Sequence, residues 1–155
     1  MHLYQTILCP VDFDENSLAA VTHATQLAAE MGATLHLLHV ISIIPTAPEI
    51  VQSIEPQNDL SARQRLQKIA DRELVGIKHQ LHTKLSFASL IPRSILATAH
   101  ELGADLIVMA THGRSGLPHL LLGSVAEYVV RHAHCPVLVV PARSSEVQIH
   151  PTKQE

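Results

Sequence analysis

Residues 106–141, LIVMATHGRSGLPHLLLGSVAEYVVRHAHCPVLVVP, decide the fold. An apolar run at 106–109 leads into a loop that contains glycines. A helical pattern begins at Gly123-Ser124, and a second apolar run fills residues 137–140. In α/β proteins a strand, a glycine loop, a helix and a strand in this order can hold a phosphate. The N–H groups of the loop and of the helix amino terminus then point toward one anion.

The loop allows two interpretations. Nine residues separate Gly113 from Gly123, and a glycine lets backbone turn sharply or approach a ligand closely. Arg114 could neutralise a phosphate, or it could be an ordinary solvated loop residue. Ser124 and Glu127 have the spacing of a capping box, which alone would indicate only a well-made helix start. The loop matches neither the Walker A sequence nor the G-x-G-x-x-G fingerprint, and neither occurs elsewhere in the chain.

The rest of the chain alternates strand and helix patterns. A helix is expected from a cap at Asp14 or Asn16 to a stop at Gly32, and another from Pro92 to a stop at Gly103. The other predicted helices cover 61–81 and 124–132; the predicted strands cover 6–11, 34–40, a weak 85–88, 106–110 and 137–140. Residues 41–60, with three prolines, are expected to form a long connection. The alternation predicts one doubly wound α/β domain, a parallel sheet with helices on both faces.

Composition narrows the function classes. The chain has 155 residues, enough for one domain with a sizeable core. A net charge of −3 and an aromatic content of 3% argue against a nucleic-acid surface. No apolar run approaches the ~18 residues of a membrane span, and acidic residues directly follow the first apolar run, unlike a signal peptide. We therefore expect no membrane partner, no nucleic-acid partner and a cytoplasmic location.

The cysteines and histidines favour structural roles over a metal site. Cys9 and Cys135 form no C-x-x-C pair, and Cys9 is expected to be buried and reduced. Among the 12 histidines, His36 and His39 should face opposite sides of a strand. His132 lies at a helix end, where it can favour the dipole. We expect no structural metal site in this chain.

With these motifs the chain resembles the universal stress protein family over about residues 3–141. Nucleotide-binding members of that family carry the pattern G-x2-G-x9-G-[ST]. This chain has Ala110 at the first glycine, then Gly113, and Gly123-Ser124 at the end. Further matches are Pro10-Val11-Asp12 at the end of the first strand, His39-Val40 at the end of the second, and the last strand at 137–140.

The resemblance implies a fold and a site. The fold is a Rossmann-like, adenine nucleotide alpha hydrolase-like domain of residues 1–142 with strand order 3-2-1-4-5. Residues 143–155 are polar, and from this we expect a flexible tail. The ligand is ATP or another adenine nucleotide, with Mg²⁺. The nucleotide-binding residues that it implies are Pro10, Val11, Asp12, Val40, Ala110, His112, Gly113, Arg114, Gly123, Ser124 and Val125.

A general rule for open α/β sheets favours the same binding site. Ligands of open α/β sheets bind beyond the carboxyl ends of the strands, where the strand order reverses. With the implied order, Asp12 and Ala110 end the two strands that flank this switch point. Asp12 has a plainer interpretation too, as an acid near the positive end of a helix dipole.

Two functions remain open. One is a stress-response module that binds ATP or another adenine nucleotide. The alternative is a dimeric interaction protein of the same fold that binds no nucleotide. Nothing in the sequence pairs a nucleophile with a base, so an enzyme is less favoured, although slow ATP hydrolysis assisted by Mg²⁺ is compatible with the pattern.

The last strand predicts a homodimer. An apolar strand at the end of the implied order is an exposed edge that something must cover. The resemblance implies that the same strand of a second chain pairs with it across a two-fold axis. The residues of this strand are Val137, Leu138, Val139 and Val140. No residue of the sequence is assigned a catalytic role.

Overall fold

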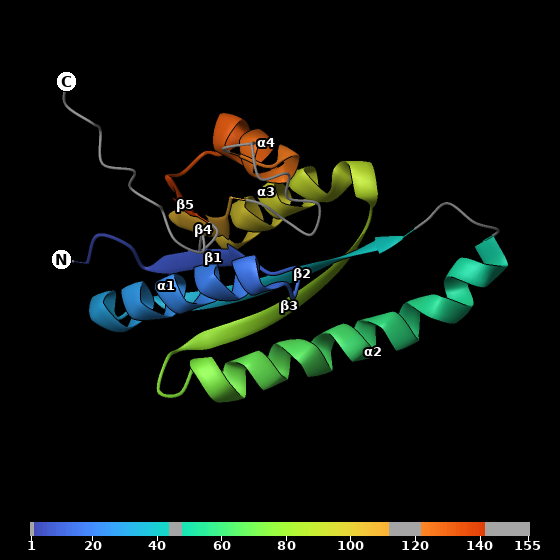
Figure 1. Cartoon of the computed structure of the whole chain (residues 1–155), viewed down its shortest axis with the longest axis horizontal. Coiled ribbons are helices and arrows are strands. Elements are labelled where there is room, and N and C mark those ends of the chain that lie inside the picture. Colours follow the sequence, from blue (N-terminus) through green and yellow to red (C-terminus); the bar gives the residue numbers. More distant parts are fainter. Residues whose placement is uncertain (1, 44–47, 112–121, 142–155) are drawn as a thin grey trace, which may run out of the picture.

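The computed structural model describes residues 2–43, 48–111 and 122–141, with only the backbone for 48–56. Five parallel strands form one sheet in the order β3-β2-β1-β4-β5, which confirms the predicted order (Figure 1). The strands are β1 (Thr6–Pro10), β2 (Thr34–Ile43), β3 (His79–Phe87), β4 (Leu106–Ala110) and β5 (Val137–Val140). The helices are α1 (Glu15–Met31), α2 (Pro48–Glu73), α3 (Ile91–Leu102) and α4 (Ser124–His132), with the short 3-10 helix η1 (Ala88–Leu90) before α3.

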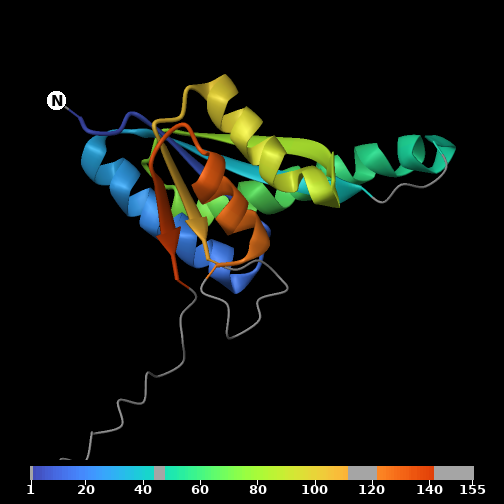
Figure 2. The same ribbon diagram turned by 90° about the horizontal axis from the view of Figure 1, so that it is seen from above.

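Two helices cover each face of the sheet. Helices α1 and α2 lie on one face, and α3 and α4 on the other (Figures 1 and 2). Side chains alternate along the strands, so Leu35 and Leu37 of β2 pack toward α1 and α2 while Leu38 packs toward α3 and α4. The predicted doubly wound architecture is confirmed.

The ends of α1 and α3 follow the sequence signals. The Asp14 carboxylate accepts a hydrogen bond from the Ser17 amide at 2.8 Å and caps α1. Gly32 and Gly103 end α1 and α3 with φ of 64° and 63°, a conformation that glycine adopts without strain.

The boundaries around the third strand were predicted wrongly. Helix α2 begins at Pro48 rather than 61 and ends at Glu73, and β3 covers His79–Phe87 rather than 85–88. The chain turns at Gly76, where φ is 76°. Polar residues of β3 hide its alternation, because this edge strand is only partly covered by helices. The expected long connection at 41–60 is wrong as well: β2 runs to Ile43, and α2 begins at a proline that a first helical turn accepts.

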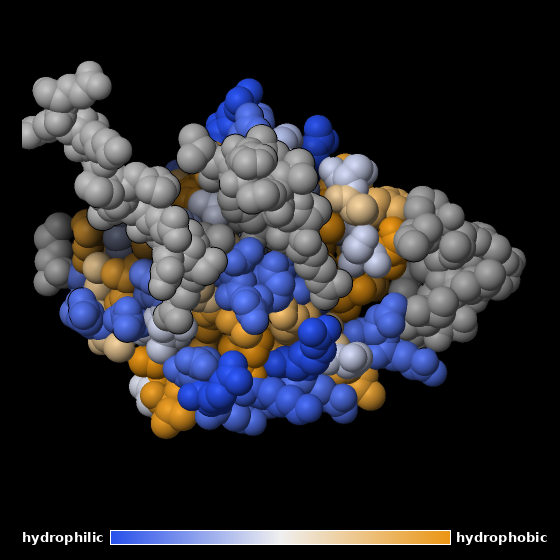
Figure 3. All heavy atoms as spheres, viewed as in Figure 1, coloured by the Kyte–Doolittle hydropathy of each residue, from blue (hydrophilic) through white to orange (hydrophobic). Residues whose placement is uncertain are grey.

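Where its side chains are described, over residues 57–73, helix α2 packs by one face. The buried side chains of the helix share a helical spacing and are Ala62, Leu66, Ile69 and Ala70; Leu74, directly after the helix, continues the same face. Hydrophilic residues predominate on the opposite side of the helix, along the lower edge of Figure 3. The Thr83 hydroxyl of β3 donates a hydrogen bond to Asp59, which joins the helix to the edge strand.

Cys9 lies in the centre of the sheet and is fully buried, as expected. Burial raises the pKa of its thiol to about 12. The thiol is therefore protonated and unreactive at neutral pH.

Two histidines meet on the face that α3 and α4 cover. Nδ1 of His36 in β2 lies 2.9 Å from Nε2 of His82 in β3, so one nitrogen carries the proton that the other accepts. Burial lowers the pKa of both rings; for His36 the neighbouring His82 adds to this, and for His82 the charges of Lys84 and Arg63 do. His39 contacts Phe13 on the other face, which confirms that His36 and His39 point to opposite sides.

This pair predicts a loss of stability in mild acid. The pKa of each folded ring lies below the ordinary 6.5, so the unfolded chain binds protons first as the pH falls. The free energy of unfolding should be at its full value above about pH 7 and decrease progressively below about pH 6.5. Urea unfolding of His82→Gln should show a flatter pH dependence over this range than the wild type. The exposed His23→Gln is the matched control, and equal slopes for His82→Gln and the wild type would contradict the prediction.

Candidate functional site

The carboxyl ends of β1 and β4 lie side by side at the point where the strand order reverses. Strand β1 pairs with β2 on one side and with β4 on the other. Figure 2 shows the arrowheads of β4 and β5 pointing to the side of the molecule where α1 and α4 begin. Asp12 follows β1 and Ala110 ends β4, so both residues lie at this edge. This edge is the candidate functional site.

The two valines at this edge have side chains on opposite faces of the sheet. Val11 is buried among the residues that contact α1 and α2, whereas Val40 packs toward α3 and α4. The Val11 amide donates to the Leu38 carbonyl at 2.8 Å. The expectation that His39 and Val40 end the second strand is wrong, because β2 continues to Ile43 along its pairing with β3. Pro10 pairs with Leu38, so continuation of the register brings Val40 level with Asp12. The backbones of the two valines can therefore flank one ligand. Their side chains cannot, because they lie on opposite faces of the sheet.

Asp12 belongs to a tight turn that starts α1. Its amide donates to Ser17 Oγ at 3.2 Å, and its Oδ1 accepts from the Asp14 amide at 3.2 Å. Burial and then the adjacent Asp12 carboxyl raise the pKa of Asp14, while the bonds from Ser17 oppose that shift. Two carboxyl groups thus lie together at the carboxyl end of β1.

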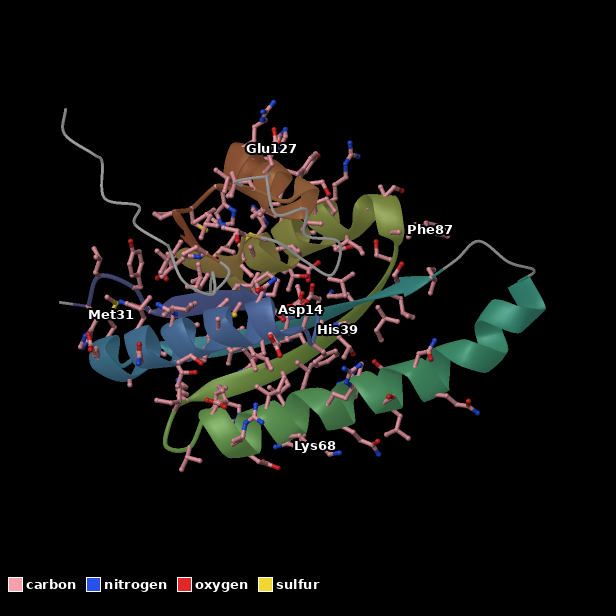
Figure 4. All side chains as sticks on the ribbon, in the orientation of Figure 1. Asp14, Met31, His39, Lys68, Phe87 and Glu127 are labelled. Atoms are coloured by element: carbon pink, nitrogen blue, oxygen red, sulfur yellow. The ribbon has the colours of Figure 1, made fainter. Side chains whose placement is uncertain are left out.

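Phe13, between these two aspartates, has a left-handed backbone with φ of 68°. Its ring lies 4.3 Å from the ring of His39, centroid to centroid, and the guanidinium carbon of Arg65 in α2 lies 4.1 Å above it. Nδ1 of His39 is 2.6 Å from the Val11 carbonyl oxygen and donates to it in the fitting tautomer. In Figure 4, Asp14 and His39 lie close to each other beside the start of α1. We call Phe13, His39 and Arg65 the aromatic clamp.

Sequence reasoning missed the aromatic clamp. Its members come from three segments that only the folded chain brings together, and no short motif links them. A signal was present in the composition, because only two phenylalanines occur in the chain and one of them directly follows Asp12.

The glycine loop between β4 and α4 is closed at its base. The Gly123 amide donates to the Thr111 carbonyl at 2.6 Å, and the Thr111 amide donates to the Val140 carbonyl at 3.0 Å. Both ends of the loop are thereby fixed to the sheet. The predicted ligands His112, Gly113 and Arg114 lie outside the described residues.

The expected cap at Ser124 is wrong. Gly123 occupies the N-cap position with φ of −69° and ψ of 163°, and Ser124 is the first helical residue. Glu127 does not complete a capping box, since its carboxylate bonds Arg131, four residues on, at 2.8 Å. The helix begins one residue earlier than the box requires, and the ion pair draws the glutamate away.

The start of α4 nonetheless presents donors. The first amides of a helix have no intrahelical partner. The Gly123 amide is taken by Thr111, which leaves those of Ser124 and Val125 as the predicted donors at this end. The Val125 side chain packs inward toward the α3–α4 face, so only its backbone can meet a ligand.

The described part of the chain contains neither a group of metal-binding side chains nor a membrane-spanning helix. Within residues 2–43, 48–111 and 122–141, no three His, Cys, Asp or Glu side chains lie close enough together to hold a metal ion. No helix in those ranges has both the length and the apolar character needed to cross a membrane.

Comparison with known proteins agrees with this geometry. The family model described as the universal stress protein family matches residues 3–141. Universal stress protein MJ0531 of Methanocaldococcus jannaschii is 34% identical over 152 residues, covering 94% of this chain and 86% of the relative. The solved structure of universal stress protein UspA from Lactobacillus plantarum has a TM-score of 0.71 at 27% identity, covering 88% of this chain and 97% of that one.

A further solved structure carries a ligand. It is a universal stress protein in complex with cAMP, with a TM-score of 0.64 at 26% identity, and the match covers 89% of this chain and 97% of that chain. The family model spans all five strands of the sheet and the helices between them. The chain belongs to the universal stress protein family.

Proposed function

We propose that this chain is a cytoplasmic stress-response module that binds an adenine nucleotide at the carboxyl edge of β1 and β4. The observation that carries the proposal is the backbone of Gly123. Its φ and ψ are open to any residue, so turn geometry does not require a glycine there. Serine, threonine, aspartate or asparagine would also cap the helix at least as well. What glycine uniquely supplies is the absence of a Cβ, beside helix amides that can bind a phosphate.

The predicted residues divide into three roles in this proposal. Phosphates bind the amides of Ser124 and Val125 together with Gly113 and Arg114. The ribose lies at Asp12, whose carboxylate can accept bonds from hydroxyl groups. The adenine lies between the backbones of Val11 and Val40; Pro10, Ala110 and His112 border the same space.

ATP with Mg²⁺ is the nucleotide that we propose first. Mg²⁺ in such sites takes one or two carboxylates and completes its shell with phosphate oxygens and water. The carboxylate of Asp12 fits this donor set, and Mg²⁺ would supply charge neutralisation for the phosphates. A relative in complex with cAMP supports the adenine ring as the shared feature of the ligand. The proposal is binding rather than turnover.

Substitution of Gly123 by serine should separate folding from binding. Gly123→Ser adds a Cβ where a phosphate would approach, and it places a good N-cap residue at the helix start. We expect an unchanged or higher Tm and an affinity for MgATP at least about tenfold weaker, measured by isothermal titration calorimetry. Ala97→Ser, on the exposed side of α3, is the control and should bind like the wild type.

Two results would contradict the nucleotide site. One is a wild type that gives neither heat nor a thermal shift with MgATP at about millimolar concentration. The other is a Gly123→Ser variant that binds MgATP as tightly as the wild type. Either result favours the alternative of an interaction protein without nucleotide.

We also propose a homodimer through β5. This strand pairs with β4 on one side only, and it is the last strand of the sheet. Leu138 is 39% exposed, although it lies in a strand of four aliphatic residues. Pro136 and Pro141 bracket the strand and limit pairing to its central residues, which favours a closed pair over a growing sheet. Antiparallel pairing with a second copy would cover this edge.

Leu138→Lys should break this dimer. The substitution places two charges in a two-fold interface, one from each copy. Light scattering at micromolar concentration should give the mass of a dimer for the wild type and of a monomer for the variant. Val75→Lys replaces a 78% exposed aliphatic residue far from β5 and should leave the mass unchanged. A monomeric wild type would contradict the proposal.

A further inference from the structure

Phe13 is held in a conformation that its own backbone disfavours. Among the described residues it is the one non-glycine with a positive φ, 68°. Its Cβ crowds the following carbonyl in the left-handed region, and such a residue persists only where its surroundings hold it there. Contacts of the Phe13 ring must therefore offset the free-energy cost of this backbone conformation.

The aromatic clamp supplies these contacts from two other elements. The ring of His39 in β2 lies against the Phe13 ring in a tilted arrangement, with centroids 4.3 Å apart and planes at 35°. Nδ1 of His39 bonds the carbonyl of Val11, directly after β1. Arg65 in α2 lies over the ring at 4.1 Å, within the distance of a cation–π interaction. The clamp thus joins the end of β1 and an inner position of β2 to α2.

The turn that the clamp holds is the one that carries Asp12. The amides on both sides of Phe13 are bonded within this turn, that of Asp12 to Ser17 Oγ and that of Asp14 to Asp12 Oδ1. A change of φ at Phe13 would rotate one of these peptides relative to the other. The position of the Asp12 carboxylate therefore depends on the conformation of Phe13, and through it on Arg65.

We propose that the aromatic clamp is a positioning device for Asp12, so that Arg65 sets the affinity for the nucleotide without touching it. This inference rests on the nucleotide site proposed above and adds to it a control by α2. Helix α2 is joined to β3 by the bond between Thr83 and Asp59 and to the site by Arg65. Any movement of α2 along the sheet would change the hold on Phe13 and thereby the position of Asp12.

The first experiment needs no ligand. Amide hydrogen exchange, followed by NMR, should be about two- to fivefold faster at Asp12 and Asp14 in Arg65→Ala than in the wild type. This factor corresponds to the loss of one exposed cation–π contact. The Val11 amide, bonded to Leu38, should be unchanged. Arg72→Ala, on the same helix and paired with Glu73, is the control and should exchange like the wild type at all three amides. Unchanged exchange at Asp12 and Asp14 in Arg65→Ala overturns the proposal.

The second experiment measures MgATP affinity in a cycle of variants. Phe13→Gly removes the ring and accepts the left-handed backbone without strain, so the fold is retained while the turn is freed. We expect binding about tenfold weaker for Phe13→Gly and about two- to fivefold weaker for Arg65→Ala, with Arg65→Lys close to the wild type. In the Phe13→Gly background, Arg65→Ala should have no further effect, because Arg65 acts through the ring.

The cycle distinguishes the clamp from direct attraction. If Arg65 attracted phosphates by its charge, its loss would weaken binding equally in both backgrounds, and that result overturns the proposal. A wild type that binds no MgATP refutes the nucleotide site. The exchange data then still decide whether the clamp holds Asp12. Failure of the nucleotide site and failure of the clamp are therefore distinguishable.

Discussion

The pairing of β1 with both β2 and β4 is the constraint on which the rest of the structure depends. This strand is buried on both faces, with Ile7 and Cys9 toward one pair of helices and Leu8 toward the other. At its carboxyl end the chain crosses to one face of the sheet from β1 and to the other face from β4. Polar groups can gather between these two connections without packing against a helix. Asp12 lies at that end because the chain must leave the sheet at Val11 and start α1 four residues later, at Glu15.

Much of this arrangement was predictable from the sequence, because it depends on local signals. Apolar runs located four of the strands closely, and Asp14, Gly32 and Gly103 marked helix ends by their own backbone preferences. Strand β3 was located poorly, because one of its faces is only partly covered and its polar residues obscure the period of two. Helix α2 began earlier than expected because Pro48 suits a first helical turn and was interpreted as a break.

In the candidate site, too, features with local signals were predictable and features that depend on distant contacts were not. Asp12, Ala110 and the start of α4 follow from the ends of elements, and the sequence placed them at one edge. The capping box failed because Glu127 has a competing partner in Arg131, which the spacing alone does not reveal. The aromatic clamp depends on contacts between residues 26 and 52 positions apart, and a single sequence carries no record of such contacts.

The bond between the Gly123 amide and the Thr111 carbonyl has a structural consequence. It fixes the two ends of the segment between β4 and α4 to each other and, through Val140, to the sheet. The entropy cost of closing a loop rises slowly with its length, and here the base is closed by bonds that lie outside the segment itself. The segment therefore begins and ends at the same two points of the sheet, whatever its length. A change of length between β4 and α4 would thus leave the register of β4 with β5 as it is.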